Sequence, residues 1–233
     1  MTTTASHVPE TKFGRWFLST WIWAQYVLLP AIKDLERLIP ARKMAYPVIV
    51  DIGCGSGCSF KMLADRFAPQ RLIGVDIDPT MLAVAEKRVA NDGVHVDFMC
   101  GSSSQLALPA GCADIIFCHQ TFHHLVDQDN ALREFRRVLK PGGLLLFSES
   151  TRRYIHSWII KLLFSHPMHV QRTAAEYVAM VRKAGFSTPD TQVSRPYFWW
   201  SRADIGIRQF ILRQAPPPRD DHDETVIALV GVR

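Results

Sequence analysis

Val48-Ile49-Val50-Asp51-Ile52-Gly53-Cys54-Gly55-Ser56-Gly57 is the most informative segment of this sequence. The apolar, β-branched run predicts a buried strand, and the three alternating glycines after it predict a tight loop. Residues 58–67 have apolar side chains at helical spacing, so the loop joins a strand to a helix. Glycine allows positive φ and lets a ligand approach the main chain closely. We therefore expect a small molecule to lie across this turn.

The spacing of these glycines narrows the chemistry of that ligand. The dinucleotide fingerprint G-x-G-x-x-G needs a glycine where this sequence has Cys58, and the Gly-Lys-Ser/Thr ending of a phosphate-binding P-loop is absent. The next predicted strand, residues 71–76, ends at Asp76, about twenty residues beyond the glycines, where a carboxylate can accept hydrogen bonds from ribose hydroxyls. The sequence therefore predicts a ribose-containing ligand without a phosphate site.

Three blocks of sequence together resemble the class I S-adenosylmethionine-dependent methyltransferases. They are Asp51-Ile-Gly-Cys-Gly-Ser-Gly57, Gly74-Val-Asp76-Ile-Asp-Pro-Thr-Met-Leu82 and Leu139-Lys-Pro-Gly-Gly143, and the resemblance covers roughly residues 45–150. It implies an α/β fold with a Rossmann-like, doubly wound, seven-stranded sheet in the order 3-2-1-4-5-7-6, the last strand being antiparallel. It also implies S-adenosyl-L-methionine as the cofactor.

Length and composition fit one compact domain, since the chain has 233 residues, of which 48% are hydrophobic, and no internal repeats. Five cysteines without metal-ligand spacing argue for a reducing compartment and against structural zinc or a disulfide framework. The formal net charge of +5 fits either solvated basic faces or attraction to an anionic membrane or acidic substrate. We expect a cytoplasmic protein, with membrane association as the alternative.

Residues 1–44 precede the first predicted strand and comprise a tail and an aromatic segment, 13–29. This segment is short for a transmembrane helix, is interrupted by polar residues, and lacks the features of a signal peptide. We expect it to form one or two helices that act as a lid on a methyltransferase domain at 45–233. The role of this segment is left open between docking on the core, lining the substrate pocket and touching a membrane. One helical face would carry Phe13, Trp16, Phe17, Thr20, Trp23, Val27 and Ala31.

The rest of the chain alternates predicted strands and helices. Asp78-Pro79 is typical of a helix start, because proline tolerates the first turn. A lid-like insertion is expected at about 151–172, where basic residues and an apolar helical face occur together. Further strands are predicted at 94–100, 113–118, 144–149, 191–200 and 225–232, and further helices at 129–139, 173–184 and 204–212.

The resemblance also implies which residues bind the cofactor. In this family the turn after the third strand usually carries Gly-Asp, whose carboxylate contacts the adenine amino group. This sequence has Gly101-Ser102-Ser103, so a serine hydroxyl or a main-chain carbonyl would replace that contact. The expected cofactor-binding residues are Asp51, Gly53, Cys54, Gly55, Gly57, Asp76, Ile77, Ser102, Ser103 and His119.

The fourth predicted strand delivers His119-Gln120-Thr121-Phe122-His123-His124 to the carboxyl edge of the sheet, where open α/β sheets bind ligands. A neutral imidazole can act as a general base, and we rank His119 ahead of His123 for this role, with Tyr154 as a further catalytic candidate. Helix capping or packing is the alternative role of the histidines. A metal site at His123 and His124 is not expected, because adjacent residues point apart and no third ligand is evident.

These observations favour methyl transfer to oxygen or carbon of a small or medium hydrophobic acceptor, such as a quinone, lipid or secondary metabolite, because the lid candidates are aromatic. The Asn/Asp-Pro-Pro-Tyr/Phe motif of exocyclic-amine methyltransferases is absent, as is the carboxylate cluster of magnesium-dependent catechol methyltransferases. The alternatives are a catalytically silent cofactor-binding scaffold and a membrane-surface protein. A nucleic-acid partner is not expected, because no basic domain is present. The acceptor atom and the oligomeric state are left open.

Overall fold

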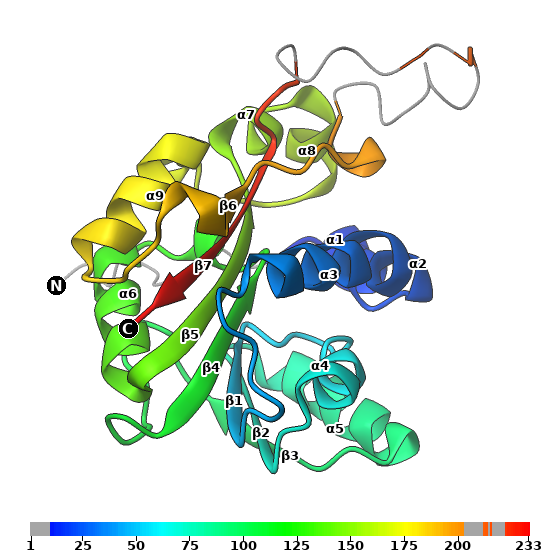
Figure 1. The fold of residues 1–233 in the computed structure, drawn as a ribbon. Coiled ribbons are helices and arrows are strands. Elements are labelled where there is room, and N and C mark those ends of the chain that lie inside the picture. The colour runs from blue at the N-terminus through cyan, green and yellow to red at the C-terminus, as the bar shows by residue number, and fades with distance from the viewer. Residues whose placement is uncertain (1–9, 203–211, 214, 216–221) are drawn as a thin grey trace, which may run out of the picture.

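The computed structural model describes residues 10–202, 212, 213, 215 and 222–233. Within them, seven strands form one sheet in the order β3-β2-β1-β4-β5-β7-β6 (Figure 1). The first five strands pair in parallel, whereas β7 pairs antiparallel with both β5 and β6, which confirms the predicted topology. The strands are β1 (Val48–Ile52), β2 (Arg71–Asp76), β3 (Val96–Cys100), β4 (Ala113–His119), β5 (Leu139–Ser150), β6 (Val193–Ser194) and β7 (Val226–Val232).

Helices cover both faces of this sheet (Figure 1). Side chains alternate along β1, so Ile49 packs into one apolar cluster and Val50 into the other, on the opposite face. Burial on both faces explains why β1 is a continuous apolar run rather than an alternating one. The helices on one face are α3 (Leu29–Leu38), α4 (Phe60–Phe67) and α5 (Pro79–Asp92), and those on the other are α6 (Gln128–Val138) and α9 (Ala174–Lys183).

The aromatic segment before β1 forms α1 (Lys12–Leu18), α2 (Trp21–Trp23) and a π-helical turn that runs into α3. The prediction of one continuous apolar face is wrong, because the helix breaks at Ser19 and Thr20. The hydroxyl of Thr20 caps α2 by accepting a hydrogen bond from the Trp23 N–H at 3.2 Å. Consequently Trp16 is 62% exposed, whereas Val27 beyond the break is buried.

The segment after β5 is also broken, into α7 (Arg152–Ile155) and α8 (Trp158–Leu163). It lies against α1. The Thr11 hydroxyl donates a hydrogen bond to the Leu163 carbonyl at 2.7 Å, and the rings of Phe13 and Phe164 are 5.9 Å apart. Within the described residues, none of the helices has the length and apolar character needed to cross a bilayer.

Several predicted elements have other bounds in the structure, including α6, β5 and β6. Helix α6 begins at Gln128, one residue before the predicted start, and is capped by Asp127. Strand β5 starts directly after it, at Leu139, and so includes the Pro-Gly-Gly segment. The strand predicted at 191–200 shrinks to β6, because Pro196 has no N–H to donate and Trp200 packs instead against Val27 and Val226. The helix predicted at 204–212 lies, except for its last residue, outside the described residues.

Candidate active site

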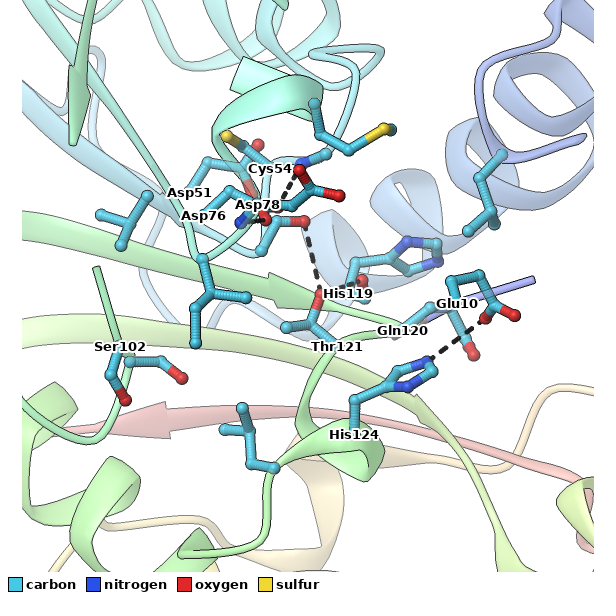
Figure 2. Close-up of a pocket in the computed structure, with 18 of the residues that line it drawn as sticks. Glu10, Asp51, Cys54, Asp76, Asp78, Ser102, His119, Gln120, Thr121 and His124 are labelled. Atoms are coloured by element: carbon cyan, nitrogen blue, oxygen red, sulfur yellow. Dashed lines mark hydrogen bonds and ion pairs between the residues drawn. The ribbon is translucent and has the colours of Figure 1, made fainter. Parts of the chain in front are cut away.

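A cavity of about 630 Å³ lies at the carboxyl ends of β1, β2 and β4, below α1 and α2. This volume is within the usual range of small-molecule sites. The position agrees with the rule that open α/β sheets bind ligands at the carboxyl ends of their strands. Figure 2 shows the acidic residues of β1 and β2 gathered on one side of the cavity and the residues after β4 on the other.

Residues 53–56 of the glycine loop form one wall of the cavity, whereas Gly57, also predicted to bind the cofactor, is not among the lining residues. Gly53, Gly55 and Gly57 all have positive φ, and the N–H groups of Gly53 and Cys54 donate to the Val75 carbonyl at 2.8 and 3.1 Å. A Cβ on Gly53 would lie 2.2 Å from the Thr121 side chain, whereas one on Gly55 would meet nothing closer than 3.9 Å. Gly53 therefore permits close packing of two loops, and Gly55 leaves main chain open to a ligand.

Asp76 stands at the end of β2 in a fixed orientation. One of its carboxylate oxygens accepts a hydrogen bond from the Gly55 N–H at 2.8 Å, and the other accepts one from the Asp78 N–H at 2.9 Å. Burial raises the pKa of Asp76, although these two hydrogen bonds oppose the shift. Each oxygen keeps further acceptor capacity, so Asp76 can receive hydroxyl donors from a ligand.

Asp51, on β1, is the second carboxylate on the cavity wall. It is 2% exposed and accepts a hydrogen bond from the hydroxyl of Ser59. Burial raises the pKa of Asp51 to about 7; the Ser59 hydrogen bond opposes this rise, and the charge of Asp76 adds to it. A cationic ligand would favour the ionised form of both acids and so would be attracted to this side of the cavity.

Three more of the predicted cofactor-binding residues line the cavity. Ile77 directly follows β2, and Ser102 and Ser103 lie in the turn after β3. The Ser102 hydroxyl accepts a hydrogen bond from the Ser104 N–H at 3.2 Å, so it helps to shape the turn as well as facing the cavity. Met81 of α5 and Leu125 also line the wall but were not predicted, because apolar residues at these places carry no distinctive sequence signal.

His119, at the end of β4, lines the cavity and is 8% exposed. Its ring stacks on Phe117 at 6.0 Å and lies 5.7 Å from the Trp23 ring of α2. Its Nε2 atom has no hydrogen-bond partner among the described residues. Burial, with an added effect of His123, lowers the pKa of His119 to about 3. His119 is therefore neutral near pH 7: it can hydrogen-bond a ligand, but it accepts a proton only weakly.

His123 lies behind the cavity wall, at 2% exposure. Its Nδ1 is 2.6 Å from one carboxylate oxygen of Glu149, a fully buried residue of β5. The other oxygen of Glu149 accepts hydrogen bonds from the N–H groups of Thr121 and Phe122, at 2.9 and 2.8 Å. One buried carboxylate thus fixes both the loop after β4 and the His123 ring. This role of Glu149 was not predicted, because its partner His123 is 26 positions away in the sequence.

Tyr154 is placed away from the cavity wall, with its ring 5.6 Å from that of Trp200, and burial raises the pKa of its hydroxyl. His124, in contrast, does line the cavity, and its Nε2 is 4.0 Å from a carboxylate oxygen of Glu10 (Figure 2). The structure therefore brings His119, and not Tyr154, together with the predicted cofactor-binding residues.

The known proteins that this chain resembles include several methyltransferases. A family model described as a methyltransferase domain matches residues 50–147. A probable S-adenosylmethionine-dependent methyltransferase of Mycolicibacterium smegmatis is 31% identical over 159 residues, which are 65% of this chain and 56% of that protein. This chain therefore spans little more than half the length of that relative. A ubiquinone biosynthesis O-methyltransferase of Methylobacterium nodulans is 28% identical over 200 residues, covering 79% of this chain and 78% of that protein.

The crystal structure of an S-adenosylmethionine-dependent methyltransferase from Aquifex aeolicus has the same fold. It superposes with a TM-score of 0.65 at 16% identity and covers 94% of this chain and 96% of that one. The residues that match the family model include the glycine loop, Asp76 and the segment from His119 to His124. Residues 50–147 therefore match a methyltransferase domain, and the chain has the fold of the class I S-adenosylmethionine-dependent methyltransferases, which use S-adenosylmethionine as the cofactor.

Proposed function

We propose that this chain transfers a methyl group from S-adenosylmethionine to an oxygen or carbon atom of a small or medium hydrophobic acceptor. The observation that carries the proposal is that one cavity has two kinds of wall. Carboxylates and open main chain form one side of it, at Asp76 and Gly55, and aromatic rings and an imidazole form the other, at Trp23, Phe117 and His119. A donor and an apolar acceptor can therefore lie side by side in the same cavity.

Asp76 would accept hydrogen bonds from the ribose hydroxyls of the donor, because both of its oxygens are already oriented by main-chain N–H groups. Asp51 would face the positive charge of the donor, and Gly55 would let the donor approach the backbone. Bound S-adenosylmethionine supplies an electrophilic methyl group. The contribution of the protein is then mainly alignment of the acceptor and exclusion of water.

His119 would orient the acceptor through its unpartnered Nε2, and Trp23 and Phe117 would enclose the apolar part of the acceptor. With a pKa of about 3, His119 suits an orienting role better than that of a strong base. The name of the Methylobacterium nodulans relative supports a phenol of the quinone type as the first acceptor class to test.

Donor binding to Asp76→Asn and Asp76→Ala, measured by isothermal titration calorimetry, tests the cofactor half of the proposal. Hydrogen bonds to a charged group contribute about 1.5–3 kcal/mol, so we expect each variant to bind S-adenosylmethionine roughly 10–100-fold more weakly. Asp129→Asn changes an exposed acid of α6 and is the matched control, with unchanged affinity. Equal affinity of wild type and Asp76→Ala would remove Asp76 as the ribose ligand.

Incubation with labelled donor and a panel of hydroxylated quinones, lipids and amines tests the transfer half. We expect label on hydrophobic phenols or enols and none on nucleic acid. Tight donor binding without any labelled product would support a silent cofactor-binding scaffold instead.

Membrane contact is a second candidate role, favoured by large apolar side chains on the outside of the lid. Trp21 on α2 is 66% exposed, and Trp158 and Leu162 on α8 are 74% and 71% exposed. Lys161 lies on α8 with Trp158 and Leu162, and Arg15 lies on α1; both are basic residues that suit an anionic surface. A membrane face beside the cavity would give a lipid-soluble acceptor a short route to it. Flotation with anionic vesicles tests this role, and a chain that stays at the bottom of the gradient argues for a lid alone.

A further inference from the structure

Three imidazoles, those of His123, His124 and His166, cluster beside the cavity. The first two belong to the 3₁₀ turn Phe122–His124, and His166 comes from the loop after α8. Their ring centroids are 4.3 Å apart for His123 and His124, 5.1 Å for His123 and His166, and 4.8 Å for His124 and His166. One nitrogen of each lies within 4.8 Å of the others, so the three rings converge on one small volume.

The structure thus brings to the pair a third histidine that the sequence did not reveal. His166 is distant from the adjacent pair in sequence, and it reaches them because the insertion after β5 folds back over the turn. The expectation that neighbouring histidines point apart also fails here. The pair lies in a tight 3₁₀ turn, and its two rings approach each other.

Glu149 contacts His123 in the way that a carboxylate usually contacts a metal-binding histidine. Its carboxylate is 2.6 Å from Nδ1 of His123, so Nδ1 carries the proton and Nε2 keeps a lone pair. Metal-ligating histidines almost always donate their second ring N–H to such a carboxylate, carbonyl or water, which fixes the tautomer and orients the ring. The carboxylate is itself fixed by the N–H groups of Thr121 and Phe122, so the ring has little freedom to turn.

We propose that His123, His124 and His166 bind a divalent transition-metal ion of the zinc type. Imidazole ligands suit zinc, cobalt, nickel or copper rather than magnesium. At zinc–nitrogen distances of about 2.0–2.1 Å, tetrahedral ligand nitrogens lie roughly 3.3 Å apart, so rotation of the His124 and His166 rings toward the fixed His123 ring would close the site.

The fourth position of such an ion would face the cavity, because His124 and Glu10 both line it and lie 4.0 Å apart (Figure 2). Glu10 or water would occupy this position. If the proposed methyl transfer is correct, an acceptor oxygen could take the same position and be held by the ion next to His119. Metal binding itself does not depend on that activity.

Metal binding can be measured directly on the untagged, chelator-treated chain. Co²⁺ titration followed by visible absorption, and equilibrium dialysis with Zn²⁺, should show saturable binding of about one ion per chain with nitrogen ligands. His166→Ala and His124→Ala should each weaken binding at least about 10-fold. His169→Ala removes an exposed histidine from the same segment and should bind as wild type does.

Glu149→Gln separates positioning from packing. The glutamine oxygen can still accept the Thr121 and Phe122 N–H groups, but its NH₂ group would donate to Nδ1 and move the His123 proton to Nε2. We expect metal affinity to fall about 10–100-fold while the circular dichroism spectrum is retained. The proposed metal site would be overturned if wild type bound the metal no more tightly than His166→Ala, or if His169→Ala lost as much metal affinity as His166→Ala. Donor binding measured in the same samples keeps this outcome distinct from failure of the proposed function.

Discussion

Three glycines with positive φ allow backbone strain, side-chain overlap and ligand approach to be measured separately. Gly53, Gly55 and Gly93 have φ of 67°, 51° and 67°. An alanine Cβ would meet Thr121 at 2.2 Å in the first case, only Met81 at 3.9 Å in the second, and nothing within 4 Å in the third. Substitution of each by alanine therefore adds one perturbation at a time.

The expected free-energy changes follow from these contacts. Alanine at positive φ costs about 1–2 kcal/mol, less roughly 0.4–1 kcal/mol because the unfolded chain loses freedom, so Gly93→Ala and Gly55→Ala should each destabilise by about 1 kcal/mol. Overpacking adds typically 1–3 kcal/mol, so Gly53→Ala should cost about 2–4 kcal/mol. Thr121 cannot easily move away, because Glu149 holds its N–H.

Urea unfolding would measure the stabilities, and calorimetry would measure the affinity for S-adenosylmethionine. We expect Gly55→Ala to match Gly93→Ala in stability but to bind the donor at least about 10-fold more weakly, because its Cβ occupies the cavity wall. The reasoning would be refuted if Gly53→Ala were as stable as Gly93→Ala, or if Gly55→Ala bound the donor as tightly as Gly93→Ala.

Three further predictions concern acid–base linkage, packing and the lid. Burial raises the pKa of Asp51 from 3.8 to about 7, so protonated Asp51 contributes stability that is complete below about pH 4 and is lost as the pH rises through 7. The unfolding midpoint of the unliganded chain should therefore fall over this range. Asp51→Asn should reduce this dependence of the midpoint on pH. A cationic donor favours ionised Asp51, so wild-type donor affinity should rise between pH 6 and pH 8 and that of Asp51→Asn should not. Phe122→Ala removes a fully buried ring that lies 5.1 Å from the Phe147 ring, and it should lower the free energy of unfolding by about 3–5 kcal/mol. The control Val84→Ala changes an exposed side chain and should lower it by at most about 0.5 kcal/mol. Urea titration measures both values. Trp158→Ser should abolish flotation with anionic vesicles at unchanged thermal stability if α8 is a membrane contact, whereas unchanged flotation would exclude that contact.

The sheet was predictable because its signals are local. Each parallel strand is an apolar run followed by a glycine, a proline or a polar turn, and the acids Asp51 and Asp76 mark the strand ends that meet the cavity. The resemblance to a known family then supplied the strand order. The N-terminal helices and β6 were less predictable, since their bounds depend on a threonine cap at Thr20 and on the packing of Trp200, which no periodicity shows.

The site was predicted best where neighbours in sequence are also neighbours in space. The glycine loop and the segment after β4 meet this condition. Glu149 and His166 do not, because β5 and the loop after α8 bring them to His123 from other parts of the chain. Their roles depend on pairing across the fold, and a single sequence carries no record of such pairs.

The buried contact between His123 and Glu149 has a consequence for how this sequence can diverge. Loss of either partner leaves the other as a buried polar group without its hydrogen bond, at a cost of about 1–3 kcal/mol or more. Replacing the two residues one after the other therefore passes through a less stable protein, whereas replacing both at once by apolar residues of matching shape does not. Among descendants of this chain, positions 123 and 149 should change together or remain as they are.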